Sequence, residues 1–161
     1  MELPRSDRPL FLPQKPYLPL GTLRDVLVYP FGVPGVSDAR LRQVLHLVGM
    51  EALADKLEDA RLWSHVLSLG EQQRLAFARV LLQKPQWVFL DEASSALDEP
   101  AEDALYHTLV EELPETAIIS VGHRSSLLQH HQHCLRLQGG GRWHLETIVH
   151  PVPGGQQPAP A

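Results

Sequence analysis

The sequence predicts an α/β fold with a mostly parallel sheet, and two observations lead to this prediction. Three short apolar runs, Pro9 to Leu12, Trp87 to Leu90 and Ala117 to Val121, show no polar alternation and are closed by turn residues. Such runs are typical of strands that are covered on both faces of a parallel sheet. Helical patterns lie between them, and strands that alternate with helices favour an α/β architecture.

Each predicted helix has its own end signals. Ser37 precedes apolar residues spaced by three and four, and Gly49 is the expected stop of that helix. A second helix is expected from about Leu69 to Gln83, because a proline soon follows it. A third follows Asp98, with Pro100 in the first turn, where the missing N–H costs little.

The remaining segments complete the predicted organisation. Residues 134–138 and 142–145 flank three glycines, which predicts a hairpin at the edge of the sheet. A single domain is expected over residues 1–149, with a helical subdomain at about 36–83. Residues 150–161 are rich in proline and glycine, so a disordered tail is expected there.

Composition excludes several classes of function. The 161 residues carry a net charge of -5, so no nucleic-acid partner is expected, since such proteins usually have a basic footprint. Cys134 is the only cysteine, which rules out an internal disulfide framework. No apolar run approaches the ~20 residues that span a bilayer. His130, His131, His133 and Cys134 are spaced poorly for tetrahedral zinc, and a solvated helix end accounts for them better.

Two adjacent carboxylates are the strongest single feature. Asp91 and Glu92 directly follow an apolar strand, at the end of the strand where open α/β sheets bind ligands. Asp91 is expected to hold Mg²⁺ through water, and Glu92 to polarise an attacking water. Alternatively, the pair only opens the following turn at Ser94-Ser95.

Ser68 and Glu71 stand three residues apart at the start of a helix. This spacing predicts a capping box, which satisfies two N–H groups at the helix terminus. The same helix terminus, with a serine hydroxyl and Gly70 allowing close approach, also forms an anion site suited to a γ-phosphate. Taken alone, capping is the better explanation.

Two further polar residues each follow a predicted strand. The amide of Gln14 is suited to contacting a metal or positioning water, as glutamines do in other NTPases, although its proline-flanked setting is typical of any loop. His123 is placed to donate a hydrogen bond to a phosphoryl group. One histidine among nine carries little weight in isolation.

The order of these features, from Gln14 through His123, resembles the ATPase cassette of ABC transporters over most of the chain. Between those ends lie Leu-Ser-x-Gly-Glu-Gln-Gln-Arg opening a helix, a strand ending in Asp-Glu, and Ser95-Ala-Leu-Asp98. In detail, residues 11–24, 66–79 and 120–124 resemble the SbmA/BacA-like bacterial half-transporters. Their relatives are the peroxisomal fatty-acyl and lysosomal cobalamin half-transporters of subfamily D.

The resemblance implies a partial P-loop NTPase (ABC ATPase) fold that binds ATP and Mg²⁺. It implies these roles: Gln14 as the Q-loop glutamine that touches metal and the transmembrane domain; Ser68, Leu69, Gly70 and Glu71 as the signature loop; Asp91 as the Walker B aspartate; Glu92 as the general base; Ser95 to Asp98 as the D-loop; His123 as the switch histidine. It further implies a second cassette facing this one head-to-tail around two ATPs. A transmembrane domain fused upstream would place the cassette at the cytoplasmic face of a membrane, expected to be the bacterial inner membrane, where hydrolysis drives substrate transport.

One departure from the family pattern is large. A phosphate loop has the pattern GxxxxGK[ST], and none of Lys15, Lys56 and Lys84 lies in it. The chain is therefore expected to lack the N-terminal strands and phosphate loop, to be inactive alone, and to be part of a longer gene in which Met1 is internal. Leu69 and Glu71 replace the more usual glycine and glutamine, a minor difference.

Two other functions stay open at this point. One is a soluble ABC ATPase of repair or translation, although repair versions usually carry long coiled-coil insertions between the glutamine and signature loops. The other is a degenerate, non-catalytic cassette that acts as an interaction module.

Overall fold

The computed structural model describes residues 9–149, which divide into two compact units. The boundary along the chain lies between His123 and Arg124. The first unit contains β1 Leu10–Leu12, β2 Gly21–Thr22, α1 Leu23–Val28, α2 Asp38–Leu47, the 3-10 helix η2 Glu51–Leu53, β3 Ala60–Arg61, α3 Trp63–Val66, α4 Leu69–Gln83, β4 Trp87–Asp91, α5 Glu99–Glu112 and β5 Ala117–Val121. The second contains the 3-10 helix η3 Ser125–His130, β6 His133–Gln138 and β7 Arg142–Thr147.

The main sheet has three parallel strands in the order β1-β4-β5, which confirms the predicted α/β class. Its register aligns Leu10 with Val88 and Leu12 with Leu90, and all four side chains are buried. Both crossovers, from β1 to β4 and from β4 to β5, run through helices, as parallel pairing requires. The carboxyl ends of the three strands therefore lie at one edge of the sheet.

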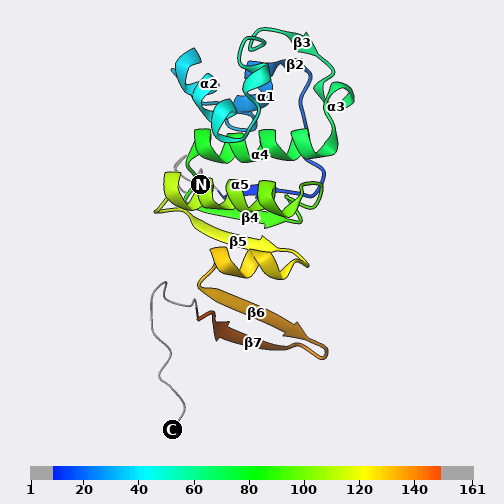
Figure 1. The fold of residues 1–161 in the computed structure, drawn as a ribbon, viewed down its shortest axis with the longest axis vertical. Coiled ribbons are helices and arrows are strands. Elements are labelled where there is room, and N and C mark those ends of the chain that lie inside the picture. Colours follow the sequence, from blue (N-terminus) through cyan, green and yellow to red (C-terminus); the bar gives the residue numbers. More distant parts are fainter. Residues whose placement is uncertain (1–8, 150–161) are drawn as a thin grey trace, which may run out of the picture. The chain divides into compact units, whose positions relative to one another are not determined.

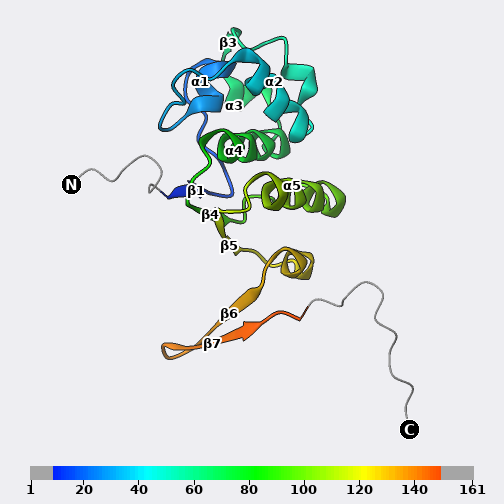
Figure 2. The same cartoon turned by 90° about the vertical axis from the view of Figure 1, so that its left-hand side faces the viewer.

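Helix α4 is the central layer of the first unit. In both ribbon views it lies between the group formed by α1, α2 and α3 and the layer formed by α5 with the sheet (Figures 1 and 2). The ring of Phe77 on α4 meets the ring of Tyr106 on α5 edge-on, with the centroids 5.8 Å apart. The Tyr106 hydroxyl in turn donates to Ser120 Oγ on β5, at 3.1 Å. Packing thus links α4, α5 and the sheet.

Local sequence explains where the long helices begin and end. Ser68 caps α4, Asp98 accepts from the Ala101 N–H at the start of α5, and Ser37 caps α2. Gly49 follows α2 with a φ of +69°, the left-handed conformation that glycine adopts without strain. These bounds agree with the helices predicted from the sequence.

The other face of the parallel sheet is largely exposed. Phe11, Trp87 and Ile119 are 65%, 45% and 40% exposed, and Phe11 stacks on Phe89 with ring centroids 4.6 Å apart. Phe11, Phe89 and Ile119 share one row of the register, so they form an apolar strip across the sheet. The expectation that these strands are covered on both faces therefore holds for one face only.

The C-terminal hairpin also differs from its prediction. Strands β6 and β7 pair antiparallel, as expected, but they form a two-stranded sheet of their own rather than an edge of the parallel sheet. Arg136 bridges them through an ion pair with Glu146 at 2.8 Å. The predicted tail at 150–161 lies outside the described residues.

Residues 9–149 contain neither a membrane-spanning helix nor a cluster of metal-ligating side chains. In this part of the chain no helix is long and apolar enough to cross a bilayer. The same residues contain no group of three or more His, Cys, Asp or Glu side chains able to hold a metal ion. No such group is formed by His130, His131, His133 and Cys134. The ring of His131 is instead hydrogen-bonded to the Leu127 carbonyl oxygen, at 2.9 Å.

Candidate functional site

The two carboxylates occupy the tip of β4. Asp91 is the last residue of the strand and is exposed, while Glu92 is the first residue beyond it. Glu92 has a φ of +48°, a left-handed conformation that costs a residue with a side chain about 1–2 kcal/mol. Its backbone N–H donates to the Val121 carbonyl oxygen at 2.9 Å, which holds this turn against the end of β5.

Glu92 and His123 meet across the strand ends. Glu92 Oε1 lies 2.8 Å from His123 Nε2, within hydrogen-bonding distance. The Glu92 side chain is 28% exposed and the His123 side chain 89% exposed, so the pair faces outward rather than into the core. The fold thus brings together two residues that follow adjacent strands: Glu92, the predicted general base, after β4, and His123, the predicted switch histidine, after β5.

Gln14 is connected to this pair through a residue that the sequence prediction missed. The side-chain amide of Gln73, on α4, donates to the Gln14 carbonyl oxygen at 2.7 Å and lies 3.5 Å from the Glu92 carbonyl oxygen. It also reaches Ser95 Oγ at 3.3 Å, and its oxygen accepts from the Ala96 N–H at 3.0 Å. The Gln14 side chain itself is on the exposed surface.

The segment Ser68–Glu71 forms the predicted capping box. Ser68 Oγ accepts from the Glu71 N–H at 3.3 Å, and the Ser68 N–H donates to Glu71 Oε2 at 2.8 Å. The Ser68 hydroxyl also donates to that carboxylate at 2.8 Å. Leu69, the next residue, is 38% exposed. The N-terminus of α4 is thus capped by side-chain hydrogen bonds and exposed to solvent.

Packing against a neighbouring segment favours glycine at position 70. A Cβ at this position would lie 3.2 Å from the Ala96 carbonyl oxygen and 3.3 Å from Leu97 Cδ2. The segment that follows Glu92 therefore runs directly against the N-terminus of α4. A side chain larger than hydrogen would push these two segments apart.

The same segment is fastened to α5 by buried polar contacts. Ser94 Oγ donates to Glu102 Oε1 at 2.5 Å, and both residues are at least 97% buried. The Asp98 carboxylate caps α5 at 2.9 Å from the Ala101 N–H, so this residue of the expected D-loop, for which nucleotide binding is also expected, has a structural role. Burial raises the pKa of the nearby Tyr106 hydroxyl, which therefore stays protonated at neutral pH.

Arg79 anchors the loop that carries Gln14. Its Nη1 donates to the Tyr17 carbonyl oxygen at 2.9 Å and its Nε to the Val26 carbonyl oxygen at 2.7 Å. The guanidinium also lies 5.3 Å from the centroid of the Tyr29 ring, in a cation–π contact. Burial lowers the pKa of Arg79 to about 10, so the group remains charged at neutral pH.

Comparison with known proteins identifies the family. A family model described as ABC transporter matches residues 7–95, just over half of the chain. The chain belongs to the ABC transporter family.

Individual relatives agree with this assignment. An ABC transporter ATP-binding protein of Haemophilus influenzae is 49% identical over 136 residues, which cover 84% of this chain and 23% of the relative. The lysosomal cobalamin transporter of Homo sapiens is 44% identical over 149 residues, covering 86% of this chain and 24% of the relative. An ATP-binding cassette sub-family D member of Mus musculus is 36% identical over 157 residues, 91% of this chain and 23% of the relative. The chain thus spans just under a quarter of the length of the relatives it matches, which include subfamily D, as expected.

Oxygen donors at the strand tips fit the metal expected in an ABC ATPase. Asp91 is an exposed carboxylate, Glu92 a partly exposed one, and the exposed Gln14 follows β1 at the same edge of the sheet. Carboxylate and amide oxygens with open space for water are what Mg²⁺ prefers. These side chains are therefore of the kind that fits Mg²⁺.

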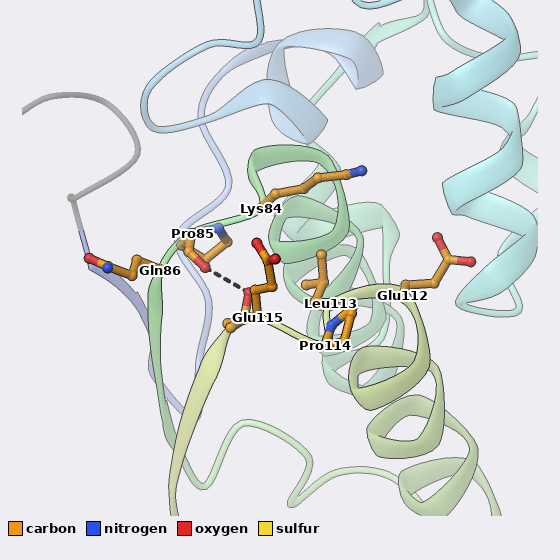
Figure 3. Close-up of a pocket in the computed structure, with 8 residues that line it drawn as sticks. Lys84, Pro85, Gln86, Glu112, Leu113, Pro114 and Glu115 are labelled. Atoms are coloured by element: carbon orange, nitrogen blue, oxygen red, sulfur yellow. Dashed lines mark hydrogen bonds between the residues drawn. The ribbon is translucent and has the colours of Figure 1, made fainter.

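A separate cavity of about 580 Å³ lies at the opposite end of the sheet, where β4 and β5 begin. Figure 3 shows Lys84, Glu112 and Glu115 around it, and Thr116 Oγ1 donates to the Pro85 carbonyl oxygen at 2.7 Å. No residue that the sequence predicts for the ABC site lines this cavity. It is distinct from the site at the strand tips.

Proposed function

We propose that this chain supplies the catalytic-base, signature and switch parts of an ATP-hydrolysing ABC half-transporter cassette. The observation that carries the proposal is the 2.8 Å contact between Glu92 and His123, at the tips of adjacent parallel strands. A partly exposed carboxylate in contact with a histidine ring is suited to orient and deprotonate an attacking water. Membership in the ABC transporter family supports transport as the work that hydrolysis drives.

We assign the remaining roles by position. Asp91 and the Gln14 side chain would hold Mg²⁺, which offsets phosphate charge in phosphoryl transfer. Ser68, Leu69, Gly70 and Glu71 would face the nucleotide of a second cassette in a head-to-tail dimer, with Asp98 at the same interface. His123 would donate a hydrogen bond toward the phosphoryl oxygens. The helix N-terminus of α4 favours an anion, which supports this assignment.

The triphosphate needs a phosphate loop that the 161 residues do not contain. Phosphoryl transfer depends chiefly on positioning and electrostatic stabilisation, so we expect negligible hydrolysis by the chain alone. We propose that a further segment supplies this loop and that a transmembrane domain, fused upstream in the same protein, completes the transporter. The cassette would then work at the cytoplasmic face of a membrane, the inner membrane in a bacterium.

The segment between Gln14 and the signature residues also favours a transporter. In this interval the structure has only short elements, α1, β2, α2, η2, β3 and α3, of which α2, with ten residues, is the longest. A long coiled-coil insertion of the kind found in repair ATPases is not part of it. A soluble ABC ATPase of repair is therefore less well supported.

The test compares ATP hydrolysis by the membrane protein that carries this chain with hydrolysis by its Glu92→Gln variant. We expect a loss of about 100-fold or more in kcat, because general-base catalysis contributes about that much. Glu111→Gln, a carboxylate change on the exposed face of α5, serves as the control and should keep the wild-type rate. The 161-residue chain alone should show no hydrolysis above background.

Two results would contradict the proposal. An unchanged rate in Glu92→Gln would indicate a degenerate cassette that acts as an interaction module. Hydrolysis by the 161-residue chain alone, abolished by Glu92→Gln, would show that no external phosphate loop is needed.

A further inference from the structure

Gln73 is a fully buried polar residue in the middle of the site. It is 0% exposed, and its side chain bonds to segments that lie far from it in sequence. A buried amide without partners is costly, whereas one with all partners fixed specifies a single arrangement of the groups around it. Its contacts therefore define which segments are held together.

The amide nitrogen of Gln73 serves the two catalytic loops. Its shortest bond, 2.7 Å, goes to the carbonyl oxygen of Gln14 in the loop after β1. The Glu92 carbonyl oxygen and Ser95 Oγ lie 3.5 and 3.3 Å from the same nitrogen. These contacts fix the main chain of the residues for which we propose metal binding and base catalysis.

The amide oxygen of Gln73 serves the segment after Glu92. It accepts from the Ala96 N–H at 3.0 Å, and the Ala96 carbonyl oxygen lies against Gly70 at the start of α4. Donor and acceptor on one planar group are thus both used, which glutamate or methionine at this position would not reproduce.

We propose that Gln73 is a positioning residue that couples the signature helix to the catalytic loops of the same cassette. Gln73 lies on α4, whose N-terminal residues Ser68–Glu71 would contact the nucleotide of the partner cassette. A helix moves largely as a rigid unit, so a shift of α4 on engaging that nucleotide is carried by Gln73 to the Gln14 and Glu92 backbones. Nucleotide binding at one ATP site of the dimer would thereby change the position of the catalytic loops at the other. This inference rests on the proposed function.

The neighbouring Gln72 provides a matched control. It is also buried, 5% exposed, and its amide donates to the carbonyl oxygens of Ser64 and Leu67 at 3.1 and 2.9 Å. Those bonds stay within the segment that leads into α4 and reach neither catalytic loop. Gln72→Met and Gln73→Met therefore remove the same chemical group from the same helix with different expected consequences.

The first measurement is amide hydrogen exchange of the full protein in the absence of nucleotide. Gln73→Met removes the acceptor of the Ala96 N–H, so exchange at Ala96 should accelerate about tenfold or more, since local protection depends on that bond. Gln72→Met should leave exchange at Ala96 within about twofold of wild type. This readout needs no ATP hydrolysis and remains informative if the proposed function is wrong.

The second measurement is steady-state ATP hydrolysis by the same proteins. Gln73→Met should lower kcat about 10- to 100-fold, because small misplacement of catalytic groups has effects of this size, and should leave KM for ATP within about twofold. Gln72→Met should keep kcat within about threefold of wild type. If Gln73→Met does not fold, the Gln73→Asn and Gln72→Asn pair, which shortens the side chain by one methylene, takes its place with the same expectations.

The outcomes separate cleanly. Faster exchange at Ala96 together with a kcat loss specific to Gln73 supports the coupling. Equal kcat in the Gln73 and Gln72 variants, or unchanged exchange at Ala96, overturns it. Faster exchange in a protein whose wild type does not hydrolyse ATP keeps the structural link but refutes the proposed function and the catalytic coupling with it.

Discussion

Replacing Arg79 by methionine tests how the loop after β1 is anchored. The change removes the bonds to the carbonyl oxygens of Tyr17 and Val26. Hydrogen bonds to a charged group contribute about 1.5–3 kcal/mol each, so about 3–6 kcal/mol is at stake. Against this, burial lowers the pKa of Arg79 to about 10, which corresponds to a desolvation cost of about 3 kcal/mol that methionine does not have. We therefore expect a net loss of about 0–3 kcal/mol.

The ordering of two variants is the sharper test. Arg79→Lys keeps a buried charge but loses the planar fork that reaches two carbonyls in different segments, so it should be at least as destabilised as Arg79→Met. Urea unfolding followed by circular dichroism gives both values. Arg74→Met, which loses one bond to the Val48 carbonyl oxygen, is the control. Arg74 is only half-buried, so water can replace part of that bond, and the change should cost about 1 kcal/mol, below the range for a buried charged group. A lysine variant close to wild type, with a methionine variant far below it, would refute the reasoning, because charge alone would then suffice.

Two smaller predictions concern Gly49, which follows α2, and Asp25, in the first turn of α1. Gly49→Ala should destabilise by about 1–2 kcal/mol in the same unfolding assay, because the left-handed φ strains alanine and its Cβ would lie 2.9 Å from Arg74 Nη1; an unchanged midpoint would contradict this. Hydrogen bonds from Thr22 lower the pKa of Asp25, so the stabilisation is present above the ordinary carboxylate pKa and disappears as pH falls through the lowered value. The Tm difference between wild type and Asp25→Asn should therefore shrink from pH 7 to pH 3, and a constant difference would argue against this capping box.

Sequence predicted the long elements well because their signals are local. The capping box at Ser68 and the cap at Asp98 fix the starts of α4 and α5 through contacts only three residues long. The short helices α1 and α3 and the two-residue strands β2 and β3 were missed, since they are too brief to show a period and depend on packing. The placement of the C-terminal hairpin was wrong for a similar reason: strand partners are a tertiary property.

The same contrast applies to the site. The order of motifs predicted the residues at the strand tips, and the structure brings Glu92 and His123 together. Their chemical roles stay predictions. Gln73 went unnoticed because a glutamine in an amphipathic helix carries no local sign of partners that lie 19 to 59 residues away. Only the folded chain shows what such an amide connects.

The left-handed backbone at Glu92 sets the stability of the fold against the proposed role of its carboxylate as a base. Folding alone would prefer glycine at that position, because glycine adopts a positive φ freely. In a homologue that does not need this carboxylate, the single substitution Glu92→Gly would therefore relieve the backbone strain. Under the proposed function, an acid kept at this position in a homologue would indicate that the base is still used, and a glycine there would indicate that it is not.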